Sequence, residues 1–240
     1  MNGPLLRKVF VTFLLAAMTL TTLSAPAAAQ QRKRRAKPSR SEDAARHATK
    51  SAKVFNDIMR VPDRAIPREL VSGAEAVVVC PGVLKAAFIV GGRKGDCTVT
   101  RRTKDGWGAP AFFNLTGGSF GAQIGASSTD FVLLIMNEDG LKGLLEDKFE
   151  IGGETGIAAG PVGREASAST NLTLDAGILS YSRSKGLFAG VALKGVAITP
   201  DNDLNRAYYS KTAREVLAEG LRPPSPVRAL SLALSRYSVK

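Results

Sequence analysis

Residues 80–99 read CPGVLKAAFIVGGRKGDCTV, and this stretch decides the fold class. An apolar run lies between a Pro-Gly pair and a glycine-rich basic segment, and a second β-branched run, CTVT, follows directly. Short apolar runs rich in β-branched residues and bounded by Gly, Pro or charged residues are typical of strands joined by turns. The stretch therefore predicts strands of an antiparallel sheet or barrel.

Similar short apolar runs occur on both sides of this stretch. The runs AVVVC (76–80), AFFNLTGG (111–118) and DFVLLIMN (130–137) are strand-like, and further β-rich runs occupy residues 154–163, 172–182 and 186–200. Apolar spacing close to 3.6 residues instead predicts helices, and these are expected at 41–60, 67–74, 139–147 and 203–219. The expected fold is α+β, a single domain in which an antiparallel β-barrel-like core is flanked by helices. Ser41 is expected to cap the first of these helices. Trp107, Phe112, Phe113, Leu187 and Phe188 are expected in the core.

The N-terminus has the layout of a secretory signal. Arg7 and Lys8 precede an apolar run over 9–25, and small residues at 27–29 follow it. A short apolar run between a positive region and small residues predicts a cleavable signal peptide. The expected organisation is a signal peptide at 1–29, a basic flexible arm at 30–40, a folded domain at 41–219 and a C-terminal tail at 220–240. We therefore expect an exported protein of the periplasm or cell envelope, either soluble or peripheral to a membrane.

The positive charge is concentrated in the arm. The chain has 33 Lys and Arg against 21 Asp and Glu, and residues 30–40 contribute a dense group of these cations: Arg32, Lys33, Arg34, Arg35, Lys37 and Arg40. Such a polar segment cannot form a core. It is either a solvated linker or an electrostatic tether to a polyanion such as anionic lipid. Nucleic acid is not expected as a partner of an exported chain.

Cys80 and Cys97 are the two cysteines of the chain. An even number of cysteines in an exported protein favours a disulfide. Closing a loop of this length would stabilise the fold by about 3 kcal/mol in the chain-entropy model. The alternative is two buried free thiols.

The sequence offers no convincing catalytic or metal site. Ser119 lies in a G-x-S-x-G motif, but the motif needs a following helix and a later His, whereas His47 precedes it. Ser182 and Lys185 have the Ser-x-x-Lys spacing of acyl-transfer enzymes, but Gly186 and strand-like flanks argue against the helix which that chemistry needs. One His and two cysteines cannot build a zinc site. We expect no enzyme activity, no catalytic residue, no metal and no cofactor.

Several stretches together resemble one known family. These are IPREL (66–70), the opening stretch at 80–99, residues 106–141, AAGPVGREASA (158–168) and ILSYSRSKGLFAGVALKG (178–195). In order and without large gaps, from about Ala65 to Lys211, they resemble the SYLF domain, also called the Ysc84 domain. The resemblance implies a non-enzymatic module that binds membrane lipids, notably phosphoinositides in eukaryotic members. Some fungal members also bind and bundle actin, a role not expected for an exported protein.

Cations beside glycine-rich turns are the candidates for contact with lipid head groups, because Lys, Arg and free backbone N–H groups all bind phosphate. Each of them could equally be an ordinary surface charge. The candidate lipid-binding residues are Arg93, Lys94, Arg101, Arg102, Arg164, Arg183 and Lys185.

The sequence thus predicts a non-enzymatic envelope protein that binds anionic phospholipid head groups, with protein partners unknown. The alternative is a periplasmic structural or interaction protein whose basic arm contacts anionic envelope polymers.

Overall fold

The computed structural model describes residues 39–61, 65–87, 90–120, 125–152, 156–163, 176–184, 186–191, 193 and 195–238. By its contacts the chain divides into two compact units, Met1–Lys37 and Pro38–Lys240. The first unit, which contains the expected signal peptide and most of the expected basic arm, lies outside the described residues.

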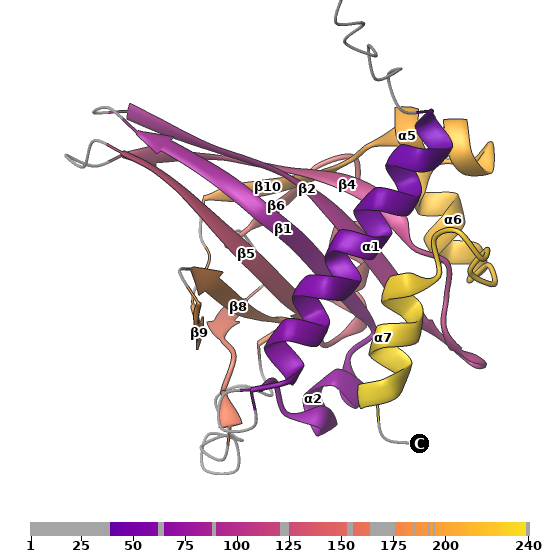
Figure 1. The fold of residues 1–240 in the computed structure, drawn as a ribbon, viewed down its shortest axis with the longest axis horizontal. Helices are drawn as coiled ribbons and strands as arrows, with labels where there is room; N and C mark the ends of the chain where they lie inside the picture. The colour runs from indigo at the N-terminus through magenta and orange to yellow at the C-terminus, as the bar shows by residue number, and fades with distance from the viewer. Residues whose placement is uncertain are drawn as a thin grey trace, which may run out of the picture. The chain divides into compact units, whose positions relative to one another are not determined.

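The second unit is built on one large sheet that curves into a nearly closed barrel (Figure 1). The strand order is β6-β10-β4-β2-β1-β5-β8-β7, and β3 and β9 pair with β2 and β8. All pairs are antiparallel except β7 with β8. The strands are β1 (Ala76–Ala87), β2 (Val90–Thr103), β3 (Gly106–Trp107), β4 (Ala111–Phe120), β5 (Gly125–Ile135), β6 (Phe149–Ile151), β7 (Ile157–Ala159), β8 (Ile178–Ser184), β9 (Leu187–Gly190) and β10 (Val196–Pro200).

The centre of the sheet is nested. β4 and β5 follow one another in the chain, yet β2 and β1 lie between them. The described residues of the stretch 80–99 therefore lie in the middle of the sheet, on the two long antiparallel strands β1 and β2. The pairing of β1 is interrupted by a register shift between Val79 and Leu84, where Pro81 and Gly82 form a bulge.

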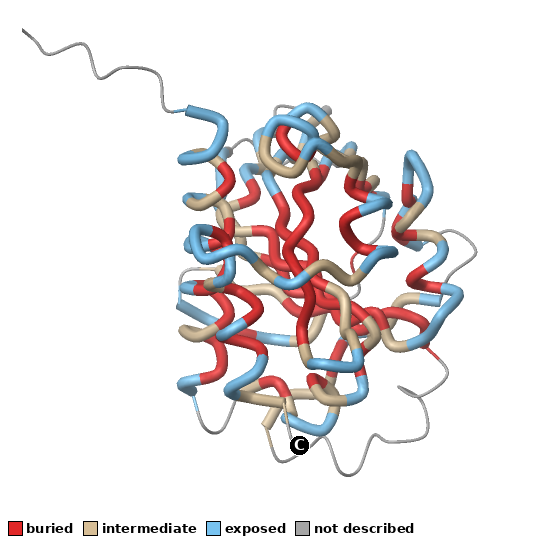
Figure 2. Tube along the Cα trace, turned by 90° about the vertical axis from the view of Figure 1, so that its right-hand side faces the viewer, coloured by how far each residue is buried: buried red, intermediate tan, exposed pale blue. Residues whose placement is uncertain are grey.

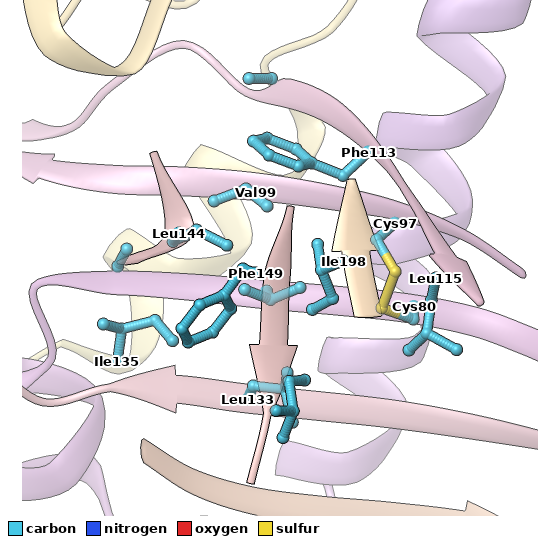
Figure 3. Close-up of a cluster of buried hydrophobic side chains, with 14 of the residues drawn as sticks. Cys80, Cys97, Val99, Phe113, Leu115, Leu133, Ile135, Leu144, Phe149 and Ile198 are labelled. Atoms are coloured by element: carbon cyan, nitrogen blue, oxygen red, sulfur yellow. A yellow bond between two sulfur atoms is a disulfide. The ribbon is translucent and has the colours of Figure 1, made fainter. Parts of the chain in front are cut away.

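A hydrophobic cluster fills the concave face of the sheet. Phe113, Leu115, Leu133 and Ile198 are at most 1% exposed, and Phe149 of β6 packs against them (Figure 3). Helices α3 (Glu138–Leu144) and α6 (Ala213–Glu219) add apolar side chains to the same cluster. Alternate residues of each strand point to this side of the sheet. Packing of their side chains in this cluster holds the curved sheet nearly closed.

Cys80 and Cys97 lie within this cluster on the adjacent strands β1 and β2. Both are fully buried, and their sulfur atoms are at bonding distance, 1.95 Å apart (Figure 3). The expected pairing is thus geometrically present. Its formation in the protein stays a prediction, tested below.

The convex face is covered by helices α1 (Arg40–Met59), α2 (Arg68–Gly73) and α7 (Ala229–Tyr237). α1 begins at a capping box in which Ser39 and Glu42 satisfy each other's backbone N–H groups, so the cap is Ser39 and not Ser41 as expected. Its apolar stripe, including Phe55 and Ile58, is buried against the sheet and α7. Figure 2 shows buried positions concentrated in the strands and on one side of the helices.

Three expectations about the C-terminal half are corrected. The single helix expected at 203–219 is two helices, α5 (Asn202–Tyr209) and α6, because Ser210 adopts a left-handed conformation and Thr212 with Glu215 forms a new capping box. The expected tail at 220–240 is wrong for 229–237, which is α7, because Leu230, Ala233 and Leu234 are buried. Leu187 was expected in the core but is 66% exposed, whereas Phe188 is buried, as strand alternation requires.

Among the described residues, no helix combines the length and the apolar character needed to span a membrane.

Candidate functional site

Lys85 and Arg93 are directly opposed residues of β1 and β2. They lie near the C-terminal end of β1 and the N-terminal end of β2. Figure 1 shows these ends of the two strands projecting beyond the layer of helices. Further pairs of directly opposed residues extend this line across the sheet from β2 to β6. Arg93 faces Gly117 of β4, Gly117 faces Val196 of β10, and Val196 faces Ile151 of β6. Opposed residues share a face, so the two cations lie on the concave side, at the rim of the buried cluster that includes Val196 and Ile151.

The two cations have no counter-charge among the described residues. Like charges directly opposite one another destabilise a sheet, and no carboxylate or hydrogen-bond acceptor of the described chain contacts the side chain of Lys85 or of Arg93. Both residues are half-buried. The rim therefore presents two adjacent, unneutralised positive charges, which is an arrangement that favours binding of an anion.

A hollow of about 620 Å³ adjoins Arg93 at this rim. Its walls are largely strand backbone, because glycines occur in each of the strands or turns that meet there. A Cβ on Gly117 would lie 2.8 Å from the carbonyl oxygen of Gly195, so a larger residue does not fit between β4 and β10. The lining residues are Arg93, Thr116, Gly117, Gly118, Lys148, Glu150, Ile151, Gly152, Gly195, Val196 and Ala197.

Lys148 and Glu150 form an ion pair at the same hollow, with 2.5 Å between Nζ and Oε1. The hydrogen bond and the charge of Lys148 lower the pKa of the Glu150 carboxyl. Both side chains are more than half exposed, so water screens the pair and it contributes little to stability. The net positive charge of the hollow therefore comes from Arg93 and its neighbour Lys85.

The seven cations expected from the sequence do not form one site. Arg93 lines the hollow, whereas Lys94 points to the opposite, convex face beside Leu84 and is exposed. Arg164 and Lys185 lie outside the described residues.

Arg101 and Arg102 are at the other end of β2, eight and nine residues along the strand from Arg93. Arg102 donates hydrogen bonds to the backbone carbonyls of Ala74 and Val71, and its guanidinium lies 4.3 Å from the centroid of the Trp107 ring. Burial lowers the pKa of Arg102. Its Nε and Nη2 atoms and its flat face contact the protein, so the lipid-binding role expected for Arg102 is not supported. Arg101 is half-buried, and its Nε has no hydrogen-bond partner within the described part of the chain.

Arg183 is likewise engaged by the protein. It donates to Asp130 of β5 and, at 3.3 Å, to Asp57 of α1. Burial alone would lower the pKa of Arg183, but the two carboxylates outweigh it and raise the pKa. Arg183 therefore ties β8 to β5 and α1, and it is not a free cation for a lipid.

The rejected catalytic motifs lie on strands. Ser119 is in β4 and Ser182 in β8, not at the start of helices. Within the described residues, no three His, Cys, Asp or Glu side chains gather in a way that could hold a metal ion.

Comparison with known proteins gives a consistent result. The model of the family Ysc84, described as "Las17-binding protein actin regulator", matches residues 116–237, about half of the chain. LAS seventeen-binding protein 3 of Saccharomyces cerevisiae is 37% identical over 174 residues, which is 70% of this chain and 38% of that protein. Protein YSC84 of the same yeast is 33% identical over 199 residues, 78% of this chain and 42% of that protein. The human SH3 domain-containing YSC84-like protein 1 is 30% identical over 174 residues, 70% of this chain and 51% of that protein.

The chain thus spans about two fifths to one half of the length of these relatives. Their names also correct one expectation. An actin-related role was excluded from the sequence because the chain has the layout of an exported protein, yet the matching family is described as an actin regulator and yeast relatives are named for binding Las17. That exclusion was wrong, because a signal-like N-terminus says nothing about what the folded domain binds. Through the family model and the identity to these proteins, the chain belongs to the Ysc84, or SYLF, family.

Proposed function

We propose that this protein is a non-enzymatic lipid-binding protein that holds an anionic phospholipid head group, of the phosphoinositide type, at the rim of its barrel. The observation that supports the proposal is the opposed pair of Lys85 and Arg93, which has no counter-charge among the described residues. A phosphate bound there would remove the repulsion between the two cations. It could also reach backbone N–H groups of the glycine-rich wall, which favour anions.

The shape of the rim fits a head group held at a membrane surface. The hollow is open and glycine-lined, and its walls include the apolar side chains of Ile151 and Val196 beside Arg93. Each basic residue close to an anionic membrane contributes about 1 kcal/mol to binding. The rim pair is thus expected to contribute about 2 kcal/mol, or roughly 30-fold in affinity.

The test is co-sedimentation with vesicles of phosphatidylcholine, with and without phosphatidylglycerol or a phosphoinositide. Lys85→Gln/Arg93→Gln is expected to weaken binding to the anionic vesicles by roughly 30-fold. The control Lys104→Gln/Arg206→Gln removes the same charge from exposed positions remote in the chain from the rim, and should lose far less. Equal losses in the two double variants would show a general charge effect and would contradict the rim site.

The contribution of the basic arm to vesicle binding is distinguished from that of the rim by comparing the chain beginning at Gln30 with one beginning at Pro38. If only the longer chain sediments with anionic vesicles or with other polyanions, the arm alone binds, as in the alternative of an arm that contacts envelope polymers. If neither chain sediments with any vesicle, lipid binding as a whole is refuted.

We also propose that the protein is exported and acts at the cell envelope, because residues 1–29 have the signal-peptide layout described above. The mass of the protein recovered from its native host tests this directly. A mature chain starting near Gln30 supports export, whereas a chain retaining residues 1–29 in the cytosol contradicts it.

A second candidate function, an interaction with actin or an actin-regulating protein, is supported by the family description and by the relatives named for Las17 binding. Sedimentation with actin filaments measures it. Pelleting that persists in Lys85→Gln/Arg93→Gln would place that contact away from the lipid-binding rim.

A further inference from the structure

β5 is paired on both sides along only part of its length. From Asp130 to Ile135 it lies between β1 and β8, but from Gly125 to Thr129 it pairs with β1 alone. No strand of the described chain covers the other side of this part, and Figure 1 shows β5 continuing past the end of β8. We call residues 125–129 the β5 edge.

The backbone of the β5 edge has unused hydrogen-bonding groups. The carbonyl of Ile135 accepts from Glu75, which precedes β1, and the N–H of Met136 donates to Gly177, which precedes β8. Odd-numbered residues of β5 therefore bond toward β1 and even-numbered residues bond toward β8, because the direction alternates along a strand. At the β5 edge, Ala126 and Ser128 thus direct N–H and C=O groups outward, and both residues are exposed.

This edge lacks the features that usually protect a free strand. Natural edges are kept short, charged, bulged or interrupted by Pro. The terminal strands β6 and β7 are each three residues long, and β6 carries exposed Glu150 and is preceded by Lys148. The β5 edge instead reads Gly-Ala-Ser-Ser-Thr, with no charge and no Pro, and its pairing with β1 is regular from Val83 to Ala87. It is a flat template for an added strand.

The charge around the edge indicates the kind of strand that would bind. The described parts of the four projecting strands, 84–87, 90–95, 116–120 and 125–129, contain Lys85, Arg93 and Lys94 and no Asp or Glu. The nearest carboxylate along β5, Asp130, is bound to Arg183. These ends of the four strands therefore carry positive and no negative side chains, which favours an acidic partner and disfavours a second copy of the same cationic strands.

We propose that the β5 edge binds an extended, acidic segment of a partner protein as an additional strand of the sheet. Main-chain hydrogen bonds to Ala126 and Ser128 provide the docking. Acidic side chains at alternate positions of the added strand lie on one face, which points to the side of Lys85 and Arg93 or, in the other register, to the side of Lys94. The proposal concerns a protein partner and does not depend on lipid binding at the rim.

The test measures binding of a labelled peptide of alternating Thr and Glu to the full chain by fluorescence anisotropy, without vesicles. Two matched peptides separate the contributions: one has Lys in place of Glu, and the other keeps Glu but is N-methylated at consecutive amides, so that both of its edges are blocked. The Glu peptide is expected to bind, and the N-methylated peptide to bind at least about tenfold more weakly, since it loses several main-chain hydrogen bonds. No binding of the Glu peptide, or equal binding of the N-methylated one, overturns the proposal.

A variant of the protein tests the same contact from the other side. Ala126→Pro removes an outward N–H without removing a bond to β1, because Pro is tolerated where the N–H of an edge strand faces solvent. It is expected to weaken binding of the Glu peptide about fivefold with an unchanged urea midpoint, while Ala126→Val, which keeps the N–H, binds normally. Unchanged binding in Ala126→Pro overturns the proposal. So does sedimentation showing that the peptide-free chain forms dimers which Ala126→Pro abolishes, because a second copy then occupies the edge.

Discussion

Arg183 donates two hydrogen bonds to one carboxylate oxygen of Asp130, at 2.9 and 2.7 Å, while the other oxygen of Asp130 accepts from the backbone N–H of Gly82 at 2.8 Å. A single carboxylate thereby holds β8 and the bulge of β1 against β5. Both charged side chains are about four-fifths buried, at 24% and 17% exposed.

Asp130→Asn is expected to lower the free energy of unfolding by about 1–3 kcal/mol, because it weakens hydrogen bonds to a charged group that is partly shielded from water. Urea unfolding followed by circular dichroism measures the change. Glu219→Gln is the control, since its pair with Lys211 is more exposed and should matter by less than about 1 kcal/mol. Equal losses for the two variants would show that the contacts of Asp130 stabilise the fold no more than an exposed ion pair does.

Gly117→Ala is expected to destabilise the fold by about 1–3 kcal/mol, because the new methyl group would lie 2.8 Å from the carbonyl oxygen of Gly195 and force β4 and β10 apart. Gly118→Ala is the matched control, since a Cβ there meets nothing within 4 Å. Thermal unfolding of both variants measures the difference. A Gly117→Ala protein as stable as Gly118→Ala would mean that the two strands can separate at no cost.

His47 is expected to make stability depend on pH. Burial lowers its pKa in the folded state, and the nearby Asp96 only partly opposes this effect. The unfolded chain therefore binds the proton more readily. The contribution of neutral His47 to the free energy of unfolding is fully present above the unfolded pKa of about 6.5. It is lost as the pH drops from there through the folded pKa. Urea unfolding between about pH 7.5 and about pH 5 should show this loss, and His47→Gln should reduce it; an identical pH dependence in the variant would assign the loss to other groups.

The pair of Cys80 and Cys97 is expected to be a disulfide in the native protein. Intact mass under non-reducing conditions should be lower by two hydrogens than after reduction. With a sequence separation of 17 between the cysteines, reduction is expected to cost about 3 kcal/mol in the chain-entropy model. Cys80→Ala/Cys97→Ala should be insensitive to reductant. An unchanged mass on reduction would show two free thiols.

Much of the fold could be predicted from local patterns. The strands around 76–103 and 111–135, the helix ending at Met59 and the burial of Trp107 and Phe113 follow from periodicity and composition. The break at Ser210 and the helix at 229–237 could not be predicted as readily. The first was signalled only by the capping box of Thr212 and Glu215, and the second depends on packing against α1.

The candidate site was predicted less completely. Arg93 was identified from its glycine-rich surroundings, but Lys85 and Lys148 were missed. Lys85 is recognised as part of the site only when it is known to lie opposite Arg93. The sequence gives this pairing only if the register of β1 against β2 is predicted first. Conversely, Arg102 and Arg183 look like free cations in sequence, because their partners at Val71, Ala74, Asp130 and Asp57 are distant along the chain.

The nested order β4-β2-β1-β5 has a consequence for what can fold by itself. The segment matched by the family model begins at residue 116, after β1 and β2. Those two strands separate β4 from β5, so a fragment starting there would lack the centre of its own sheet and would leave β5 without a partner along the whole side that pairs with β1. Such a fragment is expected to aggregate. The segment matched by the family model and the autonomous folding unit are thus different stretches of this chain, and the folding unit must begin before Ala76.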